Sequence, residues 1–181
     1  MSRTTYIVLF RGVGGATQLP TARLRSALGA AGFENVVTYI NSGNAVLSSA
    51  LDSERVLGEV ADIVHAKFGF AKAIMIATSA EWARLVKGNP FPRAVETPTR
   101  LHAFLLEKKP APAAVAALAA KTTGTERVAV ISRVAYLHTP DGFGNSKLAA
   151  VVERTPGVAA TARNWNTVLK LQALARERPI S

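Results

Sequence analysis

Residues 161–171, TARNWNTVLKL, give the first indication of the fold, because an earlier stretch of the chain repeats their pattern. Residues 78–87, TSAEWARLVK, match residues 161–170 in Thr, Trp, an aliphatic pair and Lys. Both stretches follow a short apolar segment and begin an amphipathic pattern, so each predicts a strand followed by a helix. The repeat predicts an internal duplication. Chance similarity between two amphipathic helix starts is the alternative.

The rest of the chain gives the same order of elements in both halves. In the first half we expect strands at 5–10, 36–40, 45–48 and 71–77, and helices at 20–31, 52–68 and 78–87. In the second half we expect strands at 101–106, 128–131, 134–138 and 158–161, and helices at 112–121, 146–154 and 164–176. Strand–helix–strand–strand–helix–strand is the split-βαβ order of ferredoxin-like units. The predicted fold is therefore α+β, with two tandem ferredoxin-like βαββαβ subdomains at 1–97 and 98–181 packed as one compact unit.

The polar side of the last predicted helix is unusual. A helical projection places Trp165, Val168, Leu169 and Gln172 on its inner side and Arg163, Asn166, Thr167 and Lys170 on its outer side. Thr161 or Asn164 would cap its start. Free backbone N–H groups there, with Arg163 beside them, suit an oxyanion. An ordinary solvated helix face is the alternative.

The second copy differs from the first at three polar positions. Arg163, Asn164 and Asn166 stand where the first copy has two alanines and Glu81. Shared architecture does not require these changes, which favours a functional reason for them. Trp165 and Lys170 have counterparts in the first copy, so packing and solvation explain them equally well.

Composition points to a folded, basic protein. Hydrophobic content is 49%, and 22 Lys and Arg against 12 Asp and Glu leave a formal charge of +10. Such an excess favours nucleic acid, phosphate-bearing ligands or anionic surfaces as partners. The charges are scattered, however, and general solubility is the alternative.

Other classes of protein are disfavoured. The chain has no cysteine, which excludes disulfides and thiolate metal sites. Its first apolar run, residues 6–10, is too short for a signal peptide or a membrane span. We therefore expect a soluble cytoplasmic protein that needs no membrane, metal or cofactor.

Two loops are further candidates for ligand binding. Residues 141–147, DGFGNSK, lead from a strand into a helix, where Ser146 would cap and Lys147 could hold a phosphate or carboxylate. Asn41, Ser42 and Asn44 lie at a predicted hairpin tip around Gly43. Ordinary turn and capping roles explain both loops as well.

Catalytic machinery is harder to assemble. Asp141 alone among the three aspartates lies in a motif, and His65, His102 and His138 occur singly. A strand histidine such as His102 or His138 is expected to be a satisfied packing residue. No paired carboxylates, metal spacing or nucleophile elbow are evident.

Several motifs resemble those of the DUF1697 family of bacterial proteins of unknown function. They are YIVLFRG…GG from residue 6, TYINSGNAVL from 38, NPF from 89, LHTPDGFGNSKL from 137 and TARNWNTVLKL from 161. The resemblance covers residues 6–174 and implies an α+β protein of two ferredoxin-like subdomains. It implies no reaction. The family's first loop usually reads RGINVGG, whereas residues 11–15 are RGVGG, two residues shorter.

The hypothesis from sequence is a binding protein for an anionic small molecule or nucleic acid. Its expected contacts are Ser146, Lys147, Arg163, Asn164, Asn166 and Lys170, with Arg11, Asn41, Ser42 and Asn44 as a second group. An enzyme acting on a phosphorylated or carboxylated metabolite, with Asp141 or a histidine carrying the proton, is the alternative. A structural module using an exposed sheet face is a third interpretation.

Overall fold

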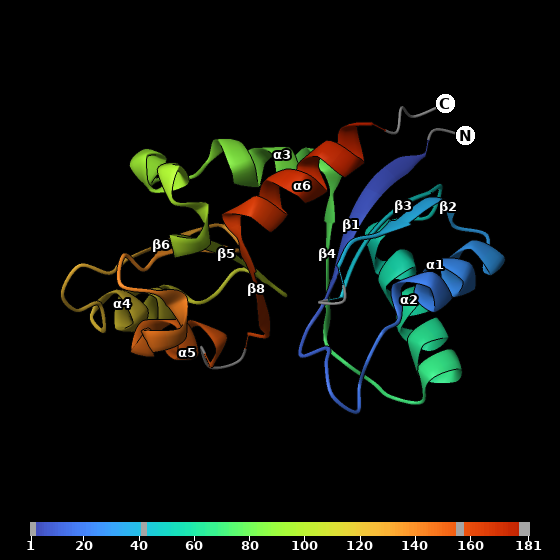
Figure 1. Cartoon of the computed structure of the whole chain (residues 1–181), viewed down its shortest axis with the longest axis horizontal. Helices are drawn as coiled ribbons and strands as arrows, with labels where there is room; N and C mark the ends of the chain where they lie inside the picture. The colour runs from blue at the N-terminus through green and yellow to red at the C-terminus, as the bar shows by residue number, and fades with distance from the viewer. Residues whose placement is uncertain (1–2, 41–42, 155–157, 178–181) are drawn as a thin grey trace. The chain divides into compact units, whose positions relative to one another are not determined.

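The computed structural model describes residues 3–40, 43–154 and 158–177, and in them the chain forms two four-stranded antiparallel sheets (Figure 1). The elements of the first half are β1 (Thr4–Phe10), α1 (Thr21–Ala30), β2 (Glu34–Thr38), β3 (Asn44–Ser49), α2 (Ser53–Phe68), β4 (Ile74–Thr78) and α3 (Ser79–Lys87). Those of the second half are η1 (Pro92–Glu96), η2 (Pro98–Arg100), β5 (Leu101–Leu106), α4 (Pro112–Ala119), β6 (Arg127–Ile131), β7 (Val134–His138), η3 (Phe143–Asn145), α5 (Lys147–Glu153), β8 (Ala160–Asn164) and α6 (Trp165–Arg176).

The two sheets have the same topology. The strand order is β2-β3-β1-β4 in sheet 1 and β6-β7-β5-β8 in sheet 2. In both, the third strand lies between the two strands that the first helix connects, which is the split-βαβ arrangement. Helices α1 and α2 cover one face of sheet 1, and α4 and α5 cover one face of sheet 2 (Figure 1). The predicted α+β class with two similar subdomains is confirmed.

The chain divides into two compact units. Unit 1 is residues 1–83 with 171–181, and unit 2 is residues 84–170. The predicted division at 97/98 separates the same two sheets. The compact units differ from it because α3 and α6 each begin in one unit and end in the other.

The core of unit 1 follows the predicted patterns. Val56, Val60 and Val64 of α2 are buried against alternate residues of β1 and β3. Asp52 caps α2 by accepting the Arg55 N–H at 2.9 Å, and Gly69 ends it in the left-handed conformation. The predicted helix and its boundaries are therefore explained by capping and by one apolar face.

The capping box predicted at the start of α3 is present. The Thr78 N–H donates to Glu81 Oε2 at 2.7 Å, and the Glu81 N–H donates to Thr78 Oγ1 at 3.1 Å. This reciprocal pair satisfies two donors at a helix start.

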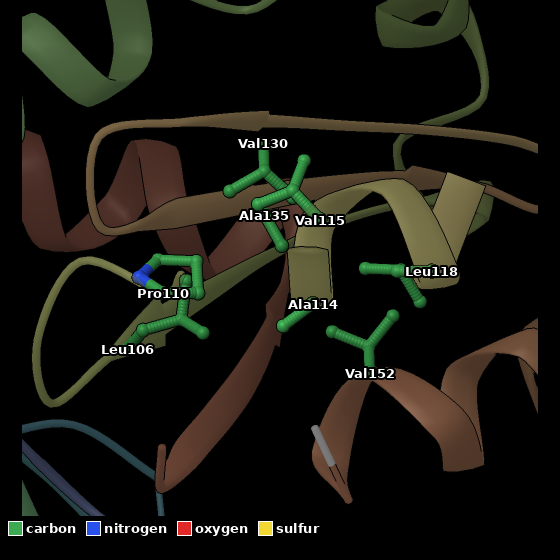
Figure 2. A pocket seen from close by; sticks show the side chains of 8 residues that line it. All are labelled: Leu106, Pro110, Ala114, Val115, Leu118, Val130, Ala135 and Val152. Carbon is green, nitrogen blue, oxygen red and sulfur yellow. The ribbon is translucent and has the colours of Figure 1, made fainter. Parts of the chain in front are cut away.

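The core of unit 2 packs α4 and α5 on β5, β7 and β8. It leaves a small gap of about 10 Å³, which Figure 2 shows surrounded by aliphatic side chains and one proline. Its lining residues are Leu106, Pro110, Ala114, Val115, Leu118, Val130, Ala135 and Val152. A space of this size holds about one water, and its apolar walls offer that water no partner. It is a packing defect.

The predicted boundary between the last strand and the last helix is wrong. We expected the strand to end at 161, yet β8 continues to Asn164 because residues 160–164 pair in register with β5. Arg163 is consequently a strand residue. The expected faces of α6 also differ from the observed ones: Thr167 is buried, whereas Leu169 is exposed.

Gly43, which precedes β3, provides a test of backbone geometry. Its φ is +78°, and a Cβ there would lie 2.8 Å from the Phe10 Cβ and 2.9 Å from the Val13 Cγ2. Gly43→Ala should therefore lower the free energy of unfolding by about 2–4 kcal/mol, from left-handed strain plus overpacking.

Gly29 in α1 is the matched control, since a Cβ there would contact nothing within 4 Å. Gly29→Ala should raise stability by about 0.5–1 kcal/mol, because alanine favours the helix. Urea denaturation of both variants measures the two values. Equal effects at the two glycines would contradict the described turn.

Candidate functional site

Side chains along β5, an inner strand of sheet 2, alternate between the two faces of the sheet, and this alternation divides the candidate residues between those faces. His102, Phe104 and Leu106 point to the face covered by α4 and α5, where Phe104 and Leu106 join the core. Ala103 and Leu105 point to the other face. Residues that pair across two strands share a face of the sheet, so the side chains of β8 can be assigned to faces from their partners in β5.

Arg163 lies on the face opposite α5. It stands across from Ala103 in the β5–β8 pair, and its Nη1 donates to Thr161 Oγ1 at 2.8 Å and to the Ala162 carbonyl at 2.7 Å. Only 8% of the residue is exposed, and burial lowers the pKa of its guanidinium to about 10, so it stays protonated at neutral pH. Arg163 therefore lies on the opposite face of sheet 2 from α5, the helix that begins at Lys147.

Asn164 caps α6. Its Oδ1 accepts the Thr167 N–H at 3.0 Å, as the sequence predicted for one of two residues. Asn166 and Lys170 are exposed and lie four residues apart, hence on one side of the helix. Asn164 stands directly across from His102 in the register, on the face that carries α5.

The loop between β7 and α5 contacts the same end of sheet 2. The Phe143 ring stacks on the His102 ring with centroids 3.8 Å apart and an interplanar angle of 21°. Gly142 packs beside the guanidinium of Arg100, where a Cβ would lie 2.8 Å from Nη1. Asp141 accepts the Thr125 hydroxyl at 2.9 Å. The loop is thus held on Arg100 and His102.

Ser146 and Lys147 occupy the start of α5. Ser146 Oγ accepts the Ala149 N–H at 3.0 Å, which confirms its predicted capping role, and the Lys147 side chain is exposed. The loop that ends in Ser146 and Lys147 contacts His102 through Phe143, and Asn164 pairs across from His102. Their roles as ligand contacts remain predictions.

His102 departs from the expectation of a satisfied packing residue. It is 8% exposed, and its Nδ1 is buried with no hydrogen-bond partner. Burial lowers its pKa to about 4, so the ring is neutral at pH 7. A neutral imidazole carries one N–H and one lone pair, and either could serve a ligand at the orphaned nitrogen.

We call this region the loop end of sheet 2. It comprises Arg100, Arg127, residues 139–147 and Asn164, where β5 and β6 begin and β7 and β8 end. Arg127 pairs across from His138, whose pKa is lowered by burial and then by the Arg127 charge. Arg100, Arg127 and Lys147 thus supply three cations, and Asp141 is the one carboxylate that the sequence places in this set.

The second group of predicted contacts belongs to unit 1. Arg11 follows β1 and donates its backbone N–H to the Ala73 carbonyl at 2.9 Å. Asn44 is buried in β3, and its Nδ2 donates to the Tyr39 carbonyl at 3.0 Å. Asn41 and Ser42 lie outside the described residues. A hollow of about 350 Å³ lies nearby, lined by Gly14 and residues 18–22.

Within the described part of the chain, no group of three His, Asp or Glu side chains could hold a metal ion. Among the same residues, no helix has both the length and the apolar character needed to cross a bilayer.

Comparison with known families identifies the chain. The sequence profile described as a protein of unknown function (DUF1697) matches residues 3–136, about three quarters of the sequence. The chain belongs to the DUF1697 family. Of the five motifs that suggested this family, those starting at residues 137 and 161 lie beyond the matched range.

A solved structure supports the fold of this DUF1697 protein. The conserved bacterial protein SP0830 from Streptococcus pneumoniae superposes with a TM-score of 0.77 at 17% identity, over 96% of this chain and 99% of that one. A comparison with curated proteins found no match.

Sequence reasoning missed the pairing of His102 with Phe143. A signal existed: His102 is a polar residue in the otherwise apolar strand LHAFLL, on the same side as Phe104 and Leu106. Which residue would cover it depends on the path of the 139–147 loop, and local periodicity does not describe that path.

Asn164 can be tested for a structural role. Asn164→Ala removes the cap of α6 and should lower the free energy of unfolding by about 1 kcal/mol. Asn166→Ala, at the exposed position two residues later, should change it by less than about 0.5 kcal/mol. Thermal or urea unfolding measures both, and a cost at Asn166 equal to that at Asn164 would contradict the cap.

The lowered pKa of His102 predicts a pH dependence of stability. The unfolded chain takes up a proton near pH 6.5, whereas the folded chain does so only near pH 4. The contribution is therefore constant above pH 6.5, and below it stability falls by about 1.4 kcal/mol per pH unit until pH 4. His102→Phe should show a shallower slope between pH 6.5 and 4. Identical slopes would rule out the buried neutral histidine.

Proposed function

We propose that this DUF1697 protein binds a phosphate-bearing anion, a nucleotide or nucleic acid, at the loop end of sheet 2. The contacts would be Lys147 and Ser146 from the start of α5, Asn164 from the cap of α6, and Asn166 and Lys170 along α6. Arg100 and Arg127 add positive charge beside them. Arg163, on the opposite face of the sheet, is not a contact in this proposal.

The distribution of charge is the observation that carries this proposal. Residues 84–170 contain thirteen Lys and Arg against five Asp and Glu, a net charge of +8. The remainder of the chain contains nine against seven, a net charge of +2. Both units have the same fold, so the fold does not require this asymmetry. Concentrated positive charge attracts phosphates.

The arrangement of donors at the loop end supports an anionic ligand. Lys147 is exposed at the start of α5, and the Ser146 hydroxyl, whose oxygen already accepts the Ala149 N–H, can still donate its proton. Asp141, the carboxylate of this set, accepts the Thr125 hydroxyl. An incoming phosphate would therefore meet mainly cations and neutral donors.

Fluorescence anisotropy with labelled single-stranded DNA, RNA and a labelled nucleotide tests the proposal. Lys147→Ala and Arg127→Ala should each weaken binding, and each should lower the slope of log K against log salt by about 1 if the residue contacts a phosphate. Lys67→Ala is the matched control, because Lys67 is an exposed lysine in the last turn of α2 in unit 1.

Two outcomes would refute the proposal. One is the absence of binding to any of the three probes at low salt. The other is an equal loss of affinity in Lys147→Ala and Lys67→Ala, which would indicate attraction by overall charge without a site.

A further inference from the structure

Edge strand β6 directs backbone hydrogen-bonding groups away from sheet 2. Within the described residues it pairs with β7, from Arg127 to Ile131 in one continuous register. Ile131 pairs with Val134 across a two-residue turn, so Ile131, Ala129 and Arg127 direct their N–H and C=O groups toward β7. The two valines between them, residues 128 and 130, direct theirs outward. Another strand can pair with β6 along this side.

The equivalent edge of sheet 1 is irregular and charged. The register of β2 with β3 shifts between Glu34 and Val37, and Asn35 within the shift has a φ of +51°. Glu34 also forms an ion pair with Arg3 at 2.6 Å. Irregular pairing and edge charges are means by which natural sheets avoid pairing with another chain. β6 has neither, because its register is continuous and residues 128–131 are Val, Ala, Val and Ile.

The helix beside β6 has an apolar outer surface. α4 packs on β6, and Val115 and Val130 line the same small gap in the core (Figure 2). Residues 111–120 are all alanine, proline, valine or leucine, yet most of them are exposed. A helix that is apolar all round is normally buried. The corresponding helix of sheet 1, α1, carries Arg23 and Arg25 on its exposed side.

We propose that β6 pairs with β6 of a second copy of this chain, which joins two copies of sheet 2 into one continuous sheet. This inference goes beyond the proposed function and does not depend on it. The antiparallel pairing is centred on Ala129, with Val128 opposite Val130 of the second copy. In this register every outward N–H and C=O group of the two valines has a partner. The two-fold axis is perpendicular to the sheet, so the apolar surfaces of the two α4 helices lie on the same face.

The sequence of β6 is self-complementary, which is why we infer a second copy as the partner. The pairing sets no like charges opposite each other: Ala129 faces Ala129, and Arg127 faces Ile131 of the second copy. Ile131 is 47% exposed, and the methylene stem of Arg127 can cover it. Pairs of β-branched residues such as Val128 and Val130 stabilise a sheet. The positive charge of unit 2 lies outside this contact and repels a second copy at long range, so the dimer should strengthen with salt. Phosphate binding has the opposite salt dependence.

Sedimentation equilibrium of the full chain at low and high salt tests the proposal. The average mass should rise toward twice that of one chain over roughly micromolar to hundreds of micromolar concentrations, because a small interface gives weak association. Ala129→Lys and Ala129→Asp should each keep the chain monomeric, since like charges then lie directly opposite. An equimolar mixture of the two variants should restore the dimer. Ala30→Lys, at the exposed end of α1 in unit 1, is the matched control and should dimerise like the wild type.

Ile131 provides a second pair of variants at an exposed position outside the core. Ile131→Lys sets a lysine opposite Arg127 in both halves of the contact and should weaken the dimer about two- to thirtyfold, whereas Ile131→Glu should retain or tighten it. Circular dichroism checks that each variant is folded.

Four outcomes would overturn the proposal. They are a chain that stays monomeric at every concentration and salt, a dimer that Ala129→Lys leaves intact, a mixture of the two Ala129 variants that stays monomeric, and equal weakening by both Ile131 variants. None of them bears on the anion site, which is tested by binding at Lys147.

Discussion

The alternation of side chains along β5 is the constraint on which the rest of the account depends. It sends His102 to the face covered by α4 and α5, and it sends Ala103 to the other face. Through the register with β8, the same alternation places Asn164 beside His102 and Arg163 on the opposite side. A one-residue shift in this register would exchange the faces of Arg163 and Asn164. The pairing therefore decides which polar groups can act together.

Comparison of the two halves shows what the second one has gained. The first half begins α3 with a reciprocal capping box between Thr78 and Glu81, and its net charge is small. In the second half, β8 ends three residues beyond Thr161, the counterpart of Thr78. Asn164 caps α6, and this half carries most of the positive charge of the chain. Because the sheets share one topology, these differences are not needed to build the fold. They coincide with the His102–Phe143 pair.

Local sequence patterns predicted the elements well where local chemistry determines them. The strand at 101–106, the caps at Asp52 and Ser146 and the capping box at Thr78 all follow from short-range periodicity and capping. The end of β8 did not follow, because its last three residues are held in the strand by β5, more than fifty positions away. A helical projection consequently placed Arg163 on a helix.

The candidate site was predictable only in part for the same reason. Lys147 and Asn164 were chosen from glycine, amide and capping signals. In the fold, Asn164 pairs across from His102, and the loop before Lys147 contacts His102 through Phe143. His102 was passed over because a strand histidine is usually satisfied, whereas its Nδ1 is not. Satisfaction of a buried nitrogen depends on the atoms that the tertiary fold brings to it, and sequence spacing carries no record of them.

Mapping backbone amide shifts on the ¹⁵N-labelled chain during titration with oligothymidylate is the most direct test of the central claim, that the loop end of sheet 2 is the ligand site. The largest shifts should fall at residues 100–102, 139–147 and 164–166. Shifts confined to unit 1, for example at residues 11–22, or no shifts at low salt, would contradict it.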